Sequence, residues 1–300
     1  MDKLSPTYLP AMYSLNDFYS MLYQSLRDAL PGAFLSTSGA YVWRGYRIDS
    51  YKNLATCQYY CLIYTAYPDS LLFEESYHYR SKYCTPFKRT MVLGKDNFFG
   101  LSIENQIKSI INFIRSASYE ALGWQISDER QKTVPKSLLL GKNNPPQWPE
   151  SKYTITHVPE LMLQAYPLQD KLFSLLQLAI EKASEMLFHQ KVEIFPNASS
   201  FNWDFRGLRM KFKDSVGKTQ EGASEYVWQI YFKDPSLIQC DKYDDEDFPF
   251  IPPFKINKSF LAAPENEQID SLTQFACESL KIEKPPFSDP FFRKPTQGTL

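Results

Sequence analysis

A short pattern that occurs twice constrains the fold of this chain more than any other feature. Residues 44–48 read Arg-Gly-Tyr-Arg-Ile, and residues 206–210, which lie 162 positions later (206 − 44), read Arg-Gly-Leu-Arg-Met. The run Gln-Ile at 106–107 recurs at 268–269 with the same spacing. Several matches in one order indicate a repeat of supersecondary units. Because the period is long, we predict two fused domains rather than a solenoid.

The spacing between the two copies changes along the chain, and the changes locate insertions. Pro68 corresponds to Pro235, so the spacing there is 167 (235 − 68). The second copy should therefore gain about five residues in a loop near residues 217–223, as surface loops allow. The run Pro-Phe-Lys at 86–88 recurs at 253–255, and we expect a loss of about five residues after the second occurrence.

The length of 300 residues allows two modest domains, each with a hydrophobic core of its own. Prolines cluster between positions 124 and 159 and again after position 284, where no periodic pattern is present. We therefore expect residues 1–123 to form a first α+β repeat and residues 160–283 a second. Residues 124–159 should be a proline-rich connector, and residues 284–300 a Pro/Phe-rich tail.

The first repeat reads as a helix, an antiparallel meander and a second helix. Apolar residues at helical spacing predict a helix that begins at Leu15, with Ser14 as its N-cap and Pro31-Gly32 at its end. Ser102 should cap a second, amphipathic helix with a stripe of isoleucines. Between the helices we predict three or four strands, at residues 41–48, 56–67, 71–79 and, for the fourth, 87–93.

The second repeat follows the same order. Its first helix, residues 168–189, is the most apolar of the chain, and a last helix follows Pro264. Three strands are expected between them, at residues 201–212, 225–233 and 237–243. The fold class is therefore predicted to be α+β, with two tandem copies of a helix–meander–helix unit whose antiparallel β-meander has three to four strands.

Each Arg-Gly-x-Arg strand carries two arginines on opposite faces, because side chains alternate along a strand. Arg44 and Arg206 share the more apolar face with large hydrophobic residues, whereas Arg47 and Arg209 point the other way. A buried guanidinium without a partner costs several kcal/mol. We therefore expect a carboxylate for each buried arginine. The candidates are Glu74 or Glu75 in the first copy and Asp241 or Glu225 in the second.

The same strands suggest a ligand site as an alternative to this structural pairing. Arginines bind phosphate and carboxylate groups, and Gly45 and Gly207 would let a backbone approach. Aromatic residues interleave with the basic ones, as in sheets that stack nucleic-acid bases. The candidate ligand-binding residues are Trp43, Arg44, Tyr46, Arg47, Trp203, Arg206 and Arg209.

No motif in the chain is specific for catalysis. There is no Gly-x-Ser-x-Gly elbow and no Gly-x-Gly-x-x-Gly run, and the three histidines are far apart in sequence. We therefore predict no catalytic residue and no cofactor, and favour a non-enzymatic role without excluding an enzyme. The first hypothesis is an intracellular binding or adaptor protein that recognises a protein partner or an anionic ligand through the duplicated Arg/aromatic strands.

Two other functions remain open. A metal-dependent hydrolase, for example a nuclease, could use the acidic run that includes Asp241, Asp244 and Asp245 to hold Mg²⁺, although such runs are usually solvated loops. A nucleic-acid-binding protein could use both sheets, although the net charge of −1 provides no general attraction for phosphate.

The cysteine pattern and the absence of targeting signals predict the compartment. The five cysteines are scattered and odd in number, and the first residues have neither a basic start nor an apolar run. No stretch approaches the roughly 18 uninterrupted apolar residues of a membrane span. We therefore expect a cytoplasmic protein with no membrane association.

Overall fold

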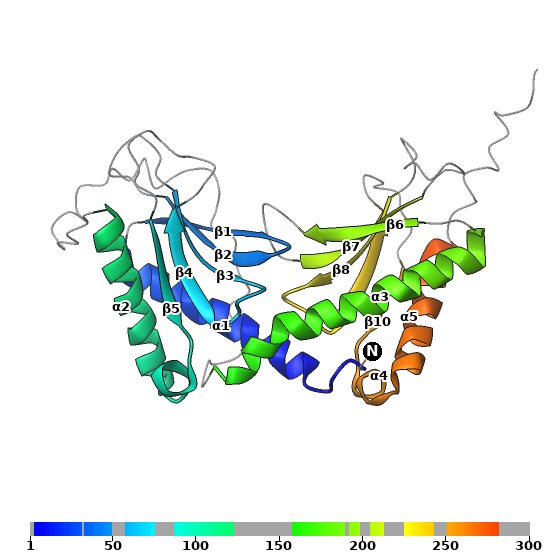
Figure 1. The fold of residues 1–300 in the computed structure, drawn as a ribbon, viewed down its shortest axis with the longest axis horizontal. Helices are drawn as coiled ribbons and strands as arrows, with labels where there is room; N and C mark the ends of the chain where they lie inside the picture. The colour runs from blue at the N-terminus through cyan, green and yellow to red at the C-terminus, as the bar shows by residue number, and fades with distance from the viewer. Residues whose placement is uncertain are drawn as a thin grey trace, which may run out of the picture.

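The computed structural model describes residues 3–31, 33–49, 58–75, 87–122, 158–189, 192–198, 205–212, 225–242 and 251–281. It is an α+β fold with two five-stranded antiparallel meander sheets, one in each half of the chain and each flanked by helices (Figure 1). The predicted fold class is therefore confirmed. Within these ranges, no helix is both long enough and apolar enough to cross a membrane.

The first half contains one sheet whose strands follow each other in chain order. A single π-helical turn, η2, separates its last strand from the second long helix. The elements are α1 (Tyr8–Ala29), β1 (Phe34–Ala40), β2 (Trp43–Asp49), β3 (Gln58–Tyr64), β4 (Ser70–Glu75), β5 (Lys88–Val92), η2 (Lys95–Phe99) and α2 (Ile103–Leu122).

The second half repeats this order, with a short 3₁₀ turn before its first long helix and a short α-helix where the first half has η2. The elements are η4 (Glu160–Gln164), α3 (Ala165–Phe188), β6 (Val192–Ala198), β7 (Phe205–Phe212), β8 (Glu225–Tyr231), β9 (Leu237–Lys242), β10 (Phe254–Lys255), α4 (Lys258–Ala262) and α5 (Glu265–Leu280).

The first helix is longer than the sequence pattern predicts. It begins at Tyr8 rather than at Leu15, and Ser14 lies inside it, where its hydroxyl donates a hydrogen bond of 2.8 Å to the carbonyl of Pro10. Pro10 is the third helical residue, and the first turn of a helix needs no backbone donor within the helix. Pro10 is therefore compatible with the helix and does not mark its boundary.

Three strands are absent from the sequence prediction, namely β1, β6 and the two-residue β10. β1 and β6 pair with the outer sides of β2 and β7, so each sheet has five strands rather than three or four. Tyr41 and Val42, which were expected to begin a strand, form the turn between β1 and β2. The predicted fourth strand at 87–93 is confirmed as β5.

The strand register confirms the duplication at the level of single residues. Gly45 on β2 pairs with Leu62 on β3, and Gly207 on β7 pairs with Gln229 on β8. The spacing is 162 between the glycines (207 − 45) and 167 between their partners (229 − 62), as the sequence spacings predict. The gain of five residues thus lies between the second and third strands of the second sheet.

One of the matches that the sequence suggests between the two copies is wrong. Leu71 on β4 pairs with Met91 on β5, and Ile238, its counterpart on β9, pairs with Phe254 on β10. Phe254 therefore corresponds to Met91 and not to Phe87, so the second Pro-Phe-Lys run matches the first by coincidence. The shorter connection in the second copy consequently precedes β10 rather than following it.

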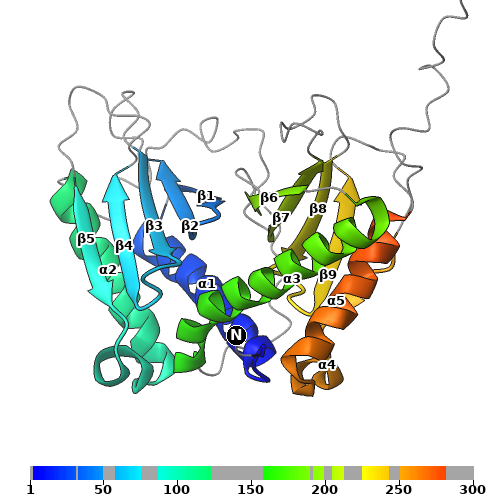
Figure 2. The same ribbon diagram turned by 45° about the vertical axis from the view of Figure 1, so that its right-hand side comes forward.

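The described helices cover one face of each sheet, and none of them lies on the other face. Figures 1 and 2 show α2 and α5 on the two outer sides of the molecule, with α1 and α3 crossing between them. Alternate strand residues belong to the same buried cluster as the helices, as the period of two in a strand requires. They are Tyr46, Ile48, Tyr59, Cys61, Ile63, Leu71 and Phe73 in the first sheet, and Leu208, Met210, Phe212, Tyr226, Trp228, Ile230, Ile238 and Cys240 in the second.

Candidate functional site

The glycines of the duplicated pattern allow an unusually close approach between strands. A Cβ atom on Gly45 would lie 2.2 Å from the carbonyl oxygen of Cys61, and one on Gly207 would lie 2.2 Å from that of Trp228. Each glycine directly follows the duplicated arginine in its own strand. The backbone of the neighbouring strand therefore lies close against both glycines.

Arg44 is buried on the helix-covered face, with 3% of its surface exposed. Its Nη1 donates a hydrogen bond of 3.2 Å to Asn16 on α1, and its Cζ lies 4.1 Å from the ring centroid of Tyr19. On its other side, Cζ lies 3.8 Å from the ring centroid of Phe232, which belongs to the second half. Asn16 also donates a hydrogen bond to the carbonyl of Phe232. Aromatic faces attract a guanidinium strongly when water is excluded.

Arg206 occupies the corresponding position in the second half and is 2% exposed. Its Nη1 donates a hydrogen bond of 2.6 Å to Gln169, and its Nη2 forms an ion pair of 2.8 Å with Asp170, both on α3. Its Cζ lies 4.2 Å from the ring centroid of Tyr41, in the β1–β2 turn of the first half. Each buried arginine is thus held by its own helix and covered by a ring from the opposite half.

Three of the four carboxylates expected for the buried arginines, Glu74, Glu225 and Asp241, have other partners. Asp170 on α3 pairs with Arg206, whereas Glu225 pairs with Arg209 and Lys211 on the adjacent strand. A partner from the covering helix was not foreseen, because sheet alternation says nothing about which helical residue lies above a given strand residue. In the first sheet, Glu74 accepts a hydrogen bond from Tyr64 and pairs with Lys88. In the second sheet, Asp241, the other carboxylate expected for Arg206, is exposed.

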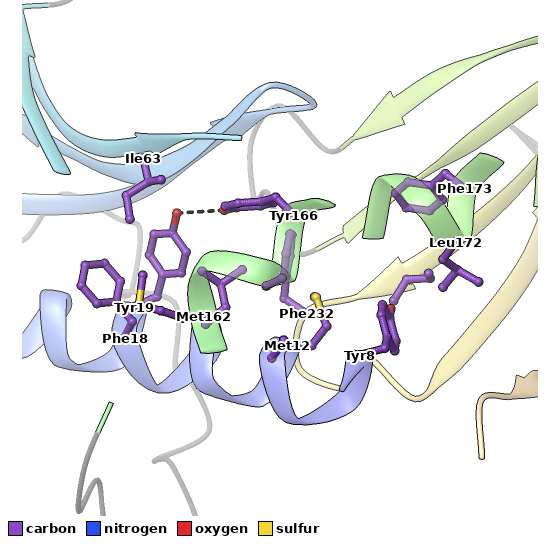
Figure 3. Close-up of a cluster of buried hydrophobic side chains, with 14 of the residues drawn as sticks. Tyr8, Met12, Phe18, Tyr19, Ile63, Met162, Tyr166, Leu172, Phe173 and Phe232 are labelled. Atoms are coloured by element: carbon purple, nitrogen blue, oxygen red, sulfur yellow. Dashed lines mark hydrogen bonds between the residues drawn. The ribbon is translucent and has the colours of Figure 1, made fainter. Parts of the chain in front are cut away.

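A pair of tyrosines lies between the two arginines. The hydroxyl oxygens of Tyr19 and Tyr166 are 2.9 Å apart (Figure 3). Tyr19 also donates a hydrogen bond of 3.0 Å to the carbonyl of Arg44. Burial raises the pKa of both phenols. Burial also lowers the pKa of Arg44 to about 10, although the nearby Tyr166, Tyr19 and Tyr46 act in the opposite direction. At neutral pH Arg44 is therefore charged, and the phenols of Tyr19 and Tyr166 are neutral.

Tyr46 completes this interior network. It is buried on the helix-covered face, and its hydroxyl donates a hydrogen bond of 2.9 Å to the carbonyl of Tyr19. Of the candidate ligand-binding residues, Arg44, Tyr46 and Arg206 thus lie in the protein interior, where they connect sheet to helix. Trp43, Arg47 and Arg209 lie on the helix-free faces and are partly exposed. Trp203 lies outside the described residues.

The helix-free face of the first sheet is covered by its own aromatic side chains. The ring centroids of Trp43 and Tyr60 are 5.3 Å apart, although the row that contains Gly45 and Leu62 separates them. Because Gly45 has no side chain, Trp43 can lean across this row. We define the first face by its partly exposed residues Trp43, Arg47, Tyr60, Tyr64, Glu74 and Lys88.

A second contact crosses the same row. The hydroxyl of Tyr64 donates a hydrogen bond of 2.9 Å to Glu74, while the Nζ of Lys88 lies 3.6 Å from the other oxygen of Glu74 and 5.8 Å from the centroid of the Tyr64 ring. Leu62 and Leu72, in the crossed row, are only 1% and 5% exposed although none of the described helices covers this face. The first face therefore combines a closed apolar floor with a rim of charged groups.

The helix-free face of the second sheet is more polar. The equivalent of Leu62 is Gln229, whose side-chain amide donates a hydrogen bond of 2.9 Å to Tyr231. The ring of Tyr231 packs against Phe205, with centroids 5.8 Å apart, and the Nζ of Lys233 lies 5.3 Å from its centroid. We define the second face by Phe195, Phe205, Arg209, Lys211, Glu225, Gln229 and Tyr231. Both faces thus keep an aromatic pair and a lysine against a tyrosine ring.

The metal alternative gains no support from the described residues. Among them, no group of three His, Cys, Asp or Glu side chains could hold a metal ion. Asp241 is exposed and accepts a hydrogen bond from the backbone of Lys242. Asp244 and Asp245 lie outside the described part of the chain, so the acidic run remains a prediction.

Comparisons with known proteins provide no relative. No family model matches the chain, and no match is found among curated proteins or among solved structures. Inferences about function therefore depend on the two sheets and on the junction between them.

Sequence reasoning missed the residues that surround the buried arginines. Tyr41 and Phe232 lie in turns, and no local pattern indicates that a turn of one half reaches the other half. A signal for the helical partners was present, since Gln169 and Asp170 are adjacent polar residues in the most apolar helix. Asn16 lies in the same way beside the apolar stripe of α1.

Proposed function

We propose that the chain is a non-catalytic binding protein that recognises a protein partner through the helix-free faces of its two sheets. The observation that carries this proposal is the placement of Arg47 and Arg209. They occupy equivalent positions on the two faces and are partly exposed. Arg47 pairs with Tyr60 on the neighbouring strand, and the Cζ of Arg209 lies 5.8 Å from the ring centroid of Phe195. Arginine and aromatic residues dominate the binding energy of protein interfaces.

The distribution of charge favours a protein partner over nucleic acid. On the second face Glu225 pairs with both Arg209 and Lys211, and on the first face Glu74 pairs with Lys88. Phosphate-led binding needs a surplus of basic groups, because the release of counterions supplies most of its affinity. Faces that carry such pairs of basic and acidic groups fit the mixed charge of a protein surface.

The difference between the two faces also supports two distinct contacts. The centre of the first face holds Leu62 and Leu72, whereas the second holds Gln229 and Gln239 at the equivalent positions. A single partner that engages both faces would therefore present an apolar segment to one and a polar segment to the other. Two linked contacts raise the overall affinity without any new interaction, provided that both can form at once.

The test is affinity capture with the full chain from an extract of cells that express it naturally. The variant is the double substitution Arg47→Ala/Arg209→Ala, and the matched control is Lys108→Ala/Lys182→Ala, two exposed lysines that form ion pairs on helices. Circular dichroism first establishes that both variants are folded. The proposal expects a discrete protein to co-purify with the wild type and the control and to be lost from the double variant. Equal recovery with all three chains would contradict it.

A second measurement separates the nucleic-acid alternative. The wild-type chain is titrated with a fluorescently labelled, random-sequence single-stranded oligonucleotide at low and at moderate salt. The proposal expects no saturable binding at moderate salt. Tight binding that weakens steeply with salt and disappears in the Arg47→Ala/Arg209→Ala variant would instead assign the faces to nucleic acid.

A further inference from the structure

We propose that the junction between the two halves is a complete recognition surface in its own right. Each half binds the other without help from the connector, and it accepts the complementary half from a second copy of the chain as well as from its own. This inference is independent of the proposed function, because it depends on the interior contacts and not on the helix-free faces.

The N-terminal segment of the chain is anchored on the second half. Leu4 is fully buried, and Gln268 on α5 binds both of its backbone groups. Its Oε1 accepts a hydrogen bond of 2.8 Å from the Leu4 amide, and its Nε2 donates one of 3.3 Å to the Leu4 carbonyl. The same Nε2 donates to Phe260, at 2.9 Å. A segment that precedes α1 is thus bound by a site on the far half (Figure 1).

The opposite half provides the equivalent parts. Val158 precedes α3 as Leu4 precedes α1, at a spacing of 154 (158 − 4), and it is also fully buried. Gln106 on α2 corresponds to Gln268 at a spacing of 162 and is likewise fully buried. η4, which follows Val158, packs against α1 of the first half. Each half therefore extends a segment toward the other.

The buried arginines repeat this reciprocal arrangement. Arg44 is bound by Asn16 of its own half and covered by Phe232 of the other, while Arg206 is bound by Asp170 of its own half. Asn16 and Asp170 are equivalent, since their spacing is again 154 (170 − 16). Arg206 is in turn covered by Tyr41 of the first half. Neither guanidinium has its full set of contacts until both halves are present.

The helices that cross at the junction share the remaining contacts. Met12, Tyr19, Met162, Tyr166, Phe173 and Phe232 belong to one buried cluster that includes residues of both halves (Figure 3). Equivalent elements therefore face each other across an approximate two-fold axis, as in the isologous interface of a symmetric dimer. Such an interface is apolar and continuous, which is the character of a permanent association.

The contacts named above join residues that lie before Ala121 to residues that lie after His157, and all of them are made within the described part of the chain. In this arrangement a covalent link only raises the local concentration of one half near the other. The same surface is then available to a half that belongs to a different molecule.

The experiment uses the full chain with a site-specific protease sequence inserted at residues 141–144. After complete cleavage, size-exclusion chromatography with light scattering reports the mass of the product. We expect one species with the mass of the uncut protein. Separate elution of the two fragments at low micromolar concentration would overturn the proposal.

Exchange between molecules is tested by mixing. Cut protein and a size-tagged cut version are unfolded together in urea, refolded by dilution and separated by native mass spectrometry. We expect hybrids, with one half from each source, in statistical amounts. Refolding of the uncut control without recovery of any hybrid would contradict recognition between copies.

A variant and a matched control locate the interface. Leu4→Ala and Leu62→Ala both truncate a fully buried leucine, but only Leu4 lies at the junction. In the cut protein, Leu4→Ala should speed dissociation of the halves by at least about ten-fold, while Leu62→Ala should leave it unchanged. Equal dissociation rates for the two variants would show that the halves do not recognise each other through this surface.

Discussion

The hydroxyl oxygens of Tyr19 and Tyr166 lie 2.9 Å apart where α1 of the first half meets α3 of the second. Tyr19 also donates a hydrogen bond to the carbonyl of Arg44, so one phenol links a helix of its own half, a strand of its own half and a helix of the opposite half. The contact places a polar group at the centre of an apolar junction. Buried polar groups specify one arrangement when all of them are satisfied.

Removal of these hydroxyls should have unequal effects. Tyr19→Phe removes two hydrogen bonds and should lower the free energy of unfolding by about 2–3 kcal/mol, because a buried polar partner loses its bond. Tyr166→Phe removes only the shared bond and should cost about 1 kcal/mol. Urea unfolding followed by circular dichroism measures both. A larger loss for Tyr166→Phe would contradict the assigned donors.

The duplicated glycines should not tolerate a side chain. Gly45→Ala and Gly207→Ala each place a Cβ atom 2.2 Å from a backbone oxygen of the neighbouring strand, which cannot move alone. We expect each to lower the free energy of unfolding by about 3 kcal/mol or more. Gly94→Ala is the control, because its Cβ would meet only the end of the Asn97 side chain. If thermal unfolding shows that Gly94→Ala is the most destabilising of the three substitutions, the neighbouring strands do not lie as close to Gly45 and Gly207 as described.

The neutral partner of Arg206 should matter more than the charged one. Gln169 is fully buried, and its loss in Gln169→Ala removes a hydrogen bond of 2.6 Å to Arg206 and leaves a cavity, at a cost of about 2–4 kcal/mol. The Asp170 side chain is 52% exposed, so Asp170→Asn should cost less than about 1 kcal/mol. Denaturant unfolding at two salt concentrations checks the order. A strongly salt-dependent loss in Asp170→Asn would mean that the ion pair dominates.

Stability should fall at alkaline pH. Burial raises the pKa of Tyr59 to about 12 and raises those of Tyr19, Tyr46 and Tyr166 above the ordinary value of 10.0. As pH rises, these tyrosines therefore lose their protons in the unfolded chain before they do so in the folded protein. Their contribution to the free energy of unfolding is complete below the pKa of the unfolded chain, and it is lost as pH rises toward the pKa values of the folded protein. The pKa of Arg44 is lowered to about 10, so this group makes the folded protein more stable as pH rises. It is one group, whereas four tyrosines change the stability in the other direction.

The measurement for this pH dependence is urea unfolding between about pH 9 and about pH 11, with tyrosinate absorbance recorded in parallel. We expect the unfolding midpoint to fall over this range, and part of the tyrosine absorbance change to appear only on unfolding. A midpoint that rises, together with complete titration of all tyrosines in the folded protein, would contradict the burial of these phenols.

Much of the fold was accessible from the sequence because the repeat could be compared with itself. Strands β2, β3, β4 and β7 to β9 have large apolar residues at every second position, and that pattern survives in both copies. β1 was missed because Ser36, Thr37, Ser38 and Gly39 are small and give no hydrophobic alternation. β6 was missed because Pro196 lowers the expectation of a strand, although an edge strand tolerates proline.

The candidate site was only partly accessible for a different reason. Alternation along a strand identified which arginines lie on the apolar face, and both are buried. It could not identify Phe232 and Tyr41 as their covers, because those contacts depend on how two halves pack and not on any local period. The carboxylate of Asp170 was missed for the same reason, since it comes from the covering helix.

A double-mutant cycle between Arg44 and Phe232 tests most directly the central claim that each half completes the core of the other. The free energy of unfolding is measured for Arg44→Met, Phe232→Leu and their combination, with the pair Arg209→Met and Phe232→Leu as a control from opposite faces of the sheets. We predict a coupling of about 1–2 kcal/mol for Arg44 with Phe232 and none for the control. Additive effects of Arg44→Met and Phe232→Leu would contradict the account.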